Sequence, residues 1–188
     1  MSGTSPEERR LPLLILGLGN VLCGDDGLGA AAVWRIQAGY DIPEGVEVLD
    51  GGTLGLSLLP WLEDAEKVIL VDAIQADTPP GSPVRLAGED VGPAVAVRLS
   101  PHQVGVSDLL DAARWRGRLP DELILLGLVP ESLDVSIELS PGVRAGLPGL
   151  VARVVEEARR LGFDLVPRRD HAASLPDRPF DRPLPLGL

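Results

Sequence analysis

The sequence predicts an α/β domain whose sheet is covered by helices on both faces, and three observations predict it. Short apolar runs typical of buried strands alternate with helical segments along the chain. The 188 residues suffice for one domain with a full core. A glycine-rich turn carrying two adjacent carboxylates directly follows the first apolar run, where open α/β sheets bind ligands.

The predicted strands are short apolar runs, each with a local reason. The first is continuous and apolar, as in a central parallel strand, and the third is equally unbroken and ends at Asp72. The second stops at Asp50 because two glycines follow it. The fourth follows a proline-rich loop and is short enough for a sheet edge. In order, the predicted strands cover residues 11–17, 46–49, 67–71, 84–86 and 122–128.

The predicted helices fill intervals between these strands. Asp25 or Asp26 is expected to cap the first helix, because acidic groups stabilise the positive end of a helix. Residues 101–105 are predicted to form a loop that leads into the third helix, because proline and glycine bound them. In order, the predicted helices cover residues 28–38, 55–61, 107–115 and 142–161.

The two ends of the chain differ from its body in composition. Residues 1–10 are polar and predict a loose N-terminus, whereas residues 11–166 predict a single α/β domain. Prolines and charges alternate beyond that point without apolar periodicity. Residues 167–188 are therefore predicted to be a flexible, proline-rich tail.

Charge and cysteine content exclude several function classes. With 17 Lys and Arg against 28 Asp and Glu, the net charge is -11, which speaks against binding a nucleic-acid backbone. The single cysteine, Cys23, excludes an internal disulfide and a cysteine-rich metal site, and it fits a cytoplasmic protein. No apolar run approaches the roughly twenty residues of a membrane span, so no membrane insertion is expected.

Three residues could carry chemistry together. Asp26 follows the first strand, Asp72 ends the third, and His102 lies in the predicted loop. If the two strands are parallel neighbours, both carboxylates emerge at the same sheet edge. Two oxygens and one nitrogen with open positions suit a borderline divalent ion such as nickel, zinc or iron better than calcium.

Each of these residues also has an ordinary structural explanation. Asp26 could only cap a helix, Asp72 could close a turn, and a single loop histidine is commonly a surface residue. Neither Asp72 nor His102 is expected in the core. Asp50, ahead of Gly51 and Gly52, is either a turn former or part of a substrate contact.

The chain resembles the hydrogenase maturation proteases, the endopeptidases that trim the C-terminus of the large subunit of nickel–iron hydrogenases. The resemblance extends from Leu13 to Leu161, and two blocks are similar to members that serve uptake-type hydrogenases. Five blocks in register carry it: Gly17-Leu-Gly-Asn-Val-Leu-Cys-Gly-Asp-Asp-Gly-Leu-Gly29, Leu49-Asp-Gly-Gly-Thr53, Ile69-Leu-Val-Asp-Ala-Ile74, Ser100-Pro-His-Gln-Val-Gly105 and Gly127-Leu-Val-Pro-Glu-Ser132.

The resemblance implies a three-layer α/β/α fold with a five-stranded, mostly parallel sheet of the phosphorylase/hydrolase-like type. It also implies that Asp26, Asp72 and His102 are the metal ligands and catalytic residues of an aspartyl-type endopeptidase. Many members carry Glu at the position of Asp26, so the shorter side chain is a departure. The Pro-rich tail also departs from the family pattern.

The implied reaction is hydrolysis of one peptide bond in a precursor that already holds nickel, with nickel as the recognition signal. The metal would polarise the scissile carbonyl or hold the attacking water. Other divalent ions, such as zinc or cadmium, could occupy the same ligands. Two alternatives remain: a non-catalytic nickel-sensing or metallochaperone module, and a peptidyl-tRNA hydrolase, whose first turn also begins Gly-Leu-Gly-Asn.

Overall fold

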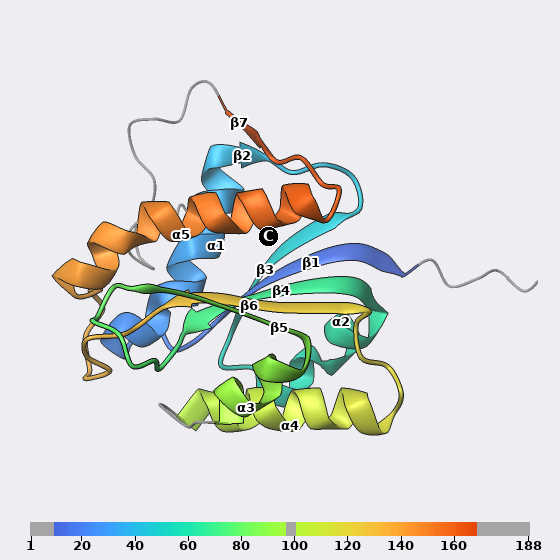
Figure 1. Ribbon diagram of the computed structural model, residues 1–188, viewed down its shortest axis with the longest axis horizontal. Helices are drawn as coiled ribbons and strands as arrows, with labels where there is room; N and C mark the ends of the chain where they lie inside the picture. The colour runs from blue at the N-terminus through green and yellow to red at the C-terminus, as the bar shows by residue number, and fades with distance from the viewer. Residues whose placement is uncertain (1–9, 97–100, 169–188) are drawn as a thin grey trace, which may run out of the picture.

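A five-stranded sheet forms the middle layer of the computed structural model, which describes residues 10–96 and 101–168 (Figure 1). Four strands are parallel, and the fifth runs antiparallel at an edge, as predicted for residues 84–86. In spatial order the strands are β3 (Val46–Gly52), β1 (Leu11–Leu18), β4 (Ala65–Ala73), β6 (Glu122–Leu128) and β5 (Pro83–Ala87).

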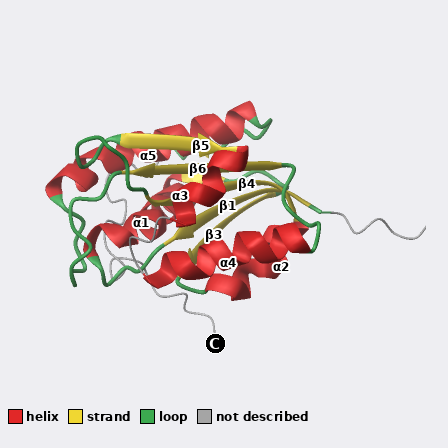
Figure 2. Ribbon diagram, turned by 60° about the horizontal axis from the view of Figure 1, so that its bottom comes forward, coloured by secondary structure: helices red, strands yellow, loops and turns green. Residues whose placement is uncertain are grey.

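Helices cover both faces of the sheet, which confirms the predicted three-layer fold (Figure 2). One face carries α1 (Leu28–Gly39) and α5 (Pro141–Arg160). The other carries α2 (Leu59–Asp64), α3 (Val91–Ala96) and α4 (Pro101–Trp115). The described chain also contains the short 3-10 helices η1 (Gly24–Gly27), η2 (Gly55–Leu58) and η3 (Gly88–Asp90).

The apolar run of β1 supplies both halves of the core. Leu13 and Ile15 join the cluster beneath α1 and α5, whereas Leu14 and Leu16 join the cluster on the opposite face. Successive side chains of a strand point to opposite faces, so a strand covered on both sides must be apolar throughout. No helix among the described residues is long and apolar enough to span a bilayer.

Two predictions about helix starts were wrong, and α3 was not predicted. The N-cap position of α1 is Gly27 and bears no side-chain cap, because η1 occupies the turn where Asp25 or Asp26 was expected to cap. Helix α4 begins at Pro101, so the predicted loop over residues 101–105 is the first turn of a helix. Proline suits this position, because the first helical N–H has no partner within the helix.

A small two-stranded sheet, which the sequence analysis missed, ends the described chain. Strand β2 (Tyr40–Asp41) pairs antiparallel with β7 (Val166–Pro167). The Arg168 backbone N–H donates to Gly39 O over 2.9 Å, and its guanidinium pairs with Asp41. The first two residues of the predicted tail therefore pack on the domain. Residues 169–188 and the predicted loose segment before residue 10 lie outside the described chain.

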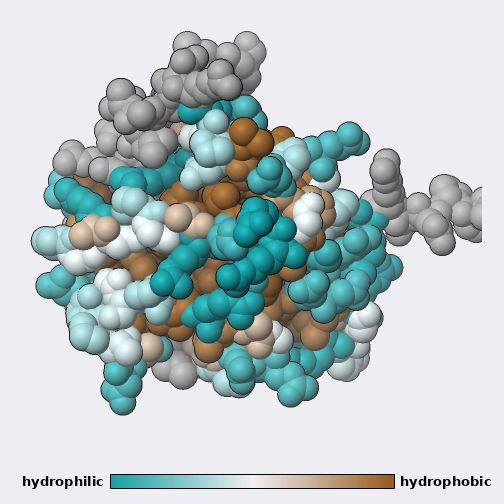
Figure 3. All heavy atoms as spheres, turned by 45° about the horizontal axis from the view of Figure 1, so that its top comes forward, coloured by the Kyte–Doolittle hydropathy of each residue, from teal (hydrophilic) through white to brown (hydrophobic). Residues whose placement is uncertain are grey.

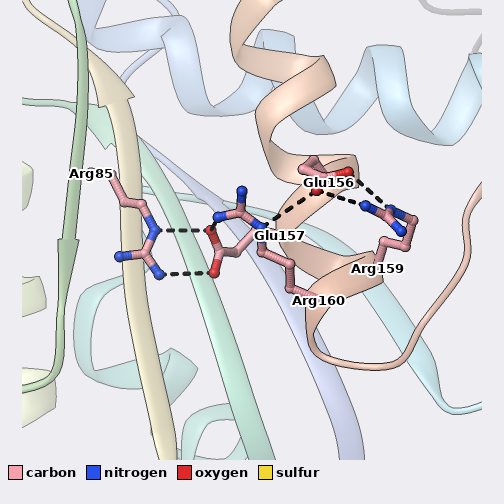
Figure 4. A network of polar contacts seen from close by, with 5 residues as sticks. All are labelled: Arg85, Glu156, Glu157, Arg159 and Arg160. Carbon is pink, nitrogen blue, oxygen red and sulfur yellow. Dashed lines mark hydrogen bonds and ion pairs between the residues drawn. The ribbon is translucent and has the colours of Figure 1, made fainter.

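A buried carboxylate ties the edge strand β5 to α5. Both oxygens of Glu157 accept from the Arg85 guanidinium, at 2.8 and 2.9 Å, and Arg160 lies beside them (Figure 4). These hydrogen bonds lower the pKa of Glu157 from its ordinary 4.5, although burial opposes the shift. The exposed side of α5 carries Arg153, Arg159 and Arg160, and a hydrophilic band crosses the middle of the view in Figure 3.

Replacing Arg85 with Gln is expected to lower the free energy of unfolding near pH 7 by about 1–2 kcal/mol, because the buried Glu157 loses its cationic partner. The loss is no larger because Arg85 is half-exposed and solvent already screens the pair. The pKa of Glu157 is lower in the folded protein than in the unfolded chain. Its ion pair therefore stabilises the fold fully at a pH above the unfolded pKa, and this stabilisation is lost as the pH falls through the folded pKa. Urea unfolding should therefore separate variant from wild type at pH 7, and the difference should shrink below about pH 4.

The matched control is Arg159→Gln, whose partner Glu156 is solvent-exposed enough that the free energy of unfolding should change little. Equal losses in the two variants, or a difference between wild type and Arg85→Gln that persists unchanged at pH 3, would contradict this account.

Candidate active site

The crevice between β1 and β4 is the point where the chain changes faces. The chain leaving β1 turns to α1 on one face, while the chain that follows β4 reaches α3 and α4 on the other. Open α/β sheets bind ligands in such crevices, outside the carboxyl ends of their strands. In Figure 1 these ends point to the left, toward the loops after β1, β4 and β6.

The carboxylates of Asp26 and Asp72 both lie at the turn formed by Gly19 and Asn20. Asp26 Oδ2 accepts from the Asn20 N–H, and Asp72 Oδ1 lies 3.7 Å from a Cβ built on Gly19, which would also collide with the backbone carbonyl of Asp26. The backbone φ of Gly19 is +116°, so both its space and its conformation require glycine. Strands β1 and β4 are parallel neighbours, which is the condition for both carboxylates to emerge at one sheet edge, and a joint role for them stays a prediction.

Both carboxylates are buried, and backbone N–H groups orient them. Asp26 is 1% exposed and Asp72 is 2% exposed. The Asn20 N–H donates to Asp26 Oδ2 over 2.9 Å, and the Ala73 N–H donates to Asp72 Oδ1 over 2.7 Å. The expectation that Asp72 lies outside the core was wrong, because its side chain is buried at the end of the central strand β4.

Asp25, the neighbour of Asp26, has a different task that the sequence analysis did not identify. It is 0% exposed and accepts three backbone N–H groups, from Glu131, Ser132 and Ser140, over 2.7–3.1 Å. These donors belong to the loop after β6, residues 129–140. A buried carboxylate is stable when several donors satisfy it. Asp25 therefore fastens this loop to the turn that carries Asp26.

Asp50 lies near the end of the neighbouring strand β3 and acts as a turn former. Its Oδ1 accepts from the Gly52 N–H over 3.0 Å, and its Oδ2 accepts from the indole N–H of Trp34 over 2.9 Å. The Gly19 N–H in turn donates to Gly52 O over 3.0 Å, so this turn supports the glycine between the two buried carboxylates. A substrate contact by Asp50, Gly51 and Gly52 stays a prediction.

His102 lies in the first turn of α4, and its side chain is outside the described part of the structure. Helix α4 begins at the same end of the molecule as the carboxyl ends of the parallel strands (Figure 1). Helix α4 packs closely on η2, because a Cβ added to Gly105 would lie only 2.9 Å from Gly55 Cα. Among the described side chains, no three His, Cys, Asp or Glu form a metal-binding group.

Comparison with known proteins identifies the family. The model of the hydrogenase maturation protease family, HycI, matches residues 31–157. Hydrogenase 2 maturation protease of Escherichia coli is 37% identical over 157 residues, covering 83% of this chain and 96% of that protein. The chain belongs to the hydrogenase maturation protease family.

Other relatives agree with this assignment. The hydrogenase expression/formation protein HupD of Rhodobacter capsulatus is 38% identical, covering 81% of this chain and 74% of that protein. The solved structure of the maturating endopeptidase HybD from E. coli superposes with a TM-score of 0.81 at 36% identity, covering 85% of this chain and 99% of HybD. HybD of Thermococcus kodakarensis has a TM-score of 0.63 at 32% identity, covering 78% and 99%. Family membership favours a peptide hydrolase over the peptidyl-tRNA hydrolase alternative.

The contact between Gly105 and Gly55 makes a prediction for this hydrogenase maturation protease. Gly105→Ala is expected to push α4 away from η2, because the added Cβ meets rigid backbone, and to lower the free energy of unfolding by about 1–3 kcal/mol. Gly149→Ala in α5 is the control, since nothing lies within 4 Å of a Cβ there. Urea unfolding measures both. Equal stability of the two variants would mean that the contact does not position α4.

Proposed function

We propose that this protease removes the C-terminal segment of a nickel-loaded large-subunit precursor of a nickel–iron hydrogenase. Asp26, Asp72 and His102 bind the nickel that the precursor brings, so the metal belongs to the substrate. The observation that carries the proposal is the pair of buried carboxylates around Gly19, at the crevice between β1 and β4.

The donor set fits a first-row metal that already has other ligands. Two carboxylates and one imidazole form an incomplete shell, which leaves positions for groups of the precursor, such as the cysteine thiolates that hold its nickel. A bound divalent ion supplies Lewis-acid polarisation and charge stabilisation during peptide hydrolysis. In the free protein the same residues bind nickel only moderately, and zinc or cadmium can take its place.

The chain's own groups hold the carboxylates ready for that metal. The Asn20 and Ala73 N–H groups each fix one carboxylate oxygen, so little reorganisation is needed when a cation arrives. Asp50, Gly51 and Gly52 lie one strand away from the pair and contact the precursor beside its scissile bond. His102 belongs to the first turn of α4, which packs on the face of the sheet opposite to α1.

Residues 11–166 act as one protease domain, and the Pro-rich residues 167–188 are dispensable for cleavage. We place the reaction in the cytoplasm, where disulfides are rare, because the sequence has one cysteine and so forms no internal disulfide.

The experiment compares nickel-free and nickel-loaded precursor with the purified protease, and mass spectrometry follows the released C-terminal peptide. We expect cleavage of the nickel-loaded form alone, even with protease in excess over the nickel-free form. Equal cleavage of both forms would contradict recognition through nickel. Binding of the nickel-loaded form without cleavage would instead favour a non-catalytic nickel-sensing or metallochaperone module.

A further inference from the structure

Exposed apolar side chains gather at the end of the molecule that holds the candidate site. Among the described residues, eight large apolar side chains are exposed, and five of them lie in the loops after β1, β3 and β6 or in η2, the short helix that follows β3. We call these five the apolar rim: Leu22, Leu54, Leu56, Val135 and Ile137. Single exposed apolar residues are ordinary, but a cluster around one site marks a contact surface.

The rim is built on a fixed backbone. The Ser136 N–H donates to Leu22 O over 3.0 Å, and the Gly24 N–H donates to Ser136 O over 2.7 Å. The hydrogen bonds to buried Asp25 hold the rest of the same loop. The exposed Val135 and Ile137 are therefore carried by a segment that backbone hydrogen bonds attach to the turn of Asp26. A preformed surface binds a partner at a lower ordering cost than a mobile one.

The rim is continuous with the candidate site on two sides. Leu22 belongs to the turn between Asn20 and Asp26, and its N–H donates to the Asn20 side chain over 3.0 Å. Leu54 follows the turn whose Gly52 O accepts from Gly19. Leu22 and Leu54 are therefore carried by the two turns that lie on either side of Gly19, next to the candidate site.

We propose that the apolar rim docks the folded body of the large-subunit precursor around the segment to be cleaved. This inference rests on the proposed function. A second copy of this chain on the rim would cover the crevice and exclude the precursor, so the rim is assigned to the substrate. The exposed Glu131 and Asp134 border the rim, so the matching precursor surface is apolar with basic residues at its margin.

The test replaces one rim residue with a polar one and measures nickel-loaded precursor binding and cleavage. Val135 is 91% exposed, so Val135→Ser should leave thermal unfolding unchanged. We expect the dissociation constant for the precursor and the KM of cleavage to rise about tenfold, with kcat unchanged, because one buried Val side chain is lost from the complex. Val166→Ser is the matched control: Val166 is exposed but lies in β7, away from the rim.

The outcomes separate this inference from the proposed function. If wild type cleaves the nickel-loaded precursor and Val135→Ser binds it as tightly as Val166→Ser, the rim is not the docking surface. A wild type that neither binds nor cleaves nickel-loaded precursor would overturn the proposed function itself. Sedimentation velocity gives the third arm. If Val135→Ser changes the oligomeric state and not the precursor affinity, the rim joins two copies of this chain and the assignment to the precursor is wrong.

Discussion

The Asp72→Asn variant is expected to leave nickel-loaded precursor uncleaved while folding as well as the wild type. Asp72 lies beside Gly19 and is one of the two carboxylates that we propose as nickel ligands, so an amide there would remove one negative charge from the proposed site. We expect cleavage to slow by roughly a thousandfold, the loss typical when one preorganised electrostatic group is removed. The free energy of unfolding should stay equal or rise, because the amide also removes repulsion between buried carboxylates.

The matched control for this variant is Asp77→Asn, an exposed aspartate a few residues beyond β4. It should cleave and unfold like the wild type. His102→Ala should lose cleavage as Asp72→Asn does, whereas its stability should change by less than about 1 kcal/mol. Cleavage by Asp72→Asn at the wild-type rate would show that this carboxylate is not a required ligand.

Asp25→Ala is expected to destabilise the protein strongly, although Asp25 is adjacent to the proposed ligand Asp26. Its buried carboxylate accepts three backbone N–H groups from the loop after β6, and alanine would leave these donors without their charged acceptor. We expect the free energy of unfolding to fall by about 3–5 kcal/mol. Urea unfolding measures this loss, and limited proteolysis should show earlier cutting within residues 129–140.

The control is Asp134→Ala in the same loop, because Asp134 is exposed and its side chain contacts only the nearby Ser132 hydroxyl among the described contacts. Its free energy of unfolding should change by less than about 0.5 kcal/mol. If Asp25→Ala lost no more stability than Asp134→Ala, Asp25 would not be the anchor of this loop.

The sequence predicted the layers and the pair of carboxylates because both follow from local patterns. Unbroken apolar runs indicate strands buried on both faces, and the run over residues 122–128 matches β6 at both ends. Asp26 and Asp72 each follow such a run, so strand ends alone placed them at one edge. The structure adds that both are buried, which depends on loops packed from distant parts of the chain.

Non-local contacts explain what the sequence did not reveal. Nothing near Asp25 in the sequence indicates that its carboxylate oxygens accept hydrogen bonds from backbone N–H groups more than one hundred residues further along the chain. Helix α4 begins at Pro101, and it packs closely on η2 where Gly105 meets Gly55, a tertiary contact that the local sequence does not indicate. The pairing of β2 with β7 also joins two-residue segments too short to carry a pattern of their own.

The most direct test of the central claim is nickel anomalous diffraction from a crystal of the free protein soaked with excess nickel. We predict one strong peak in the crevice between β1 and β4. The carboxylate oxygens of Asp26 and Asp72 and a ring nitrogen of His102 should lie within about 2.2 Å of it, which is the range for such ligands on a first-row ion. A nickel peak elsewhere, with none touching Asp26 and Asp72, would contradict it.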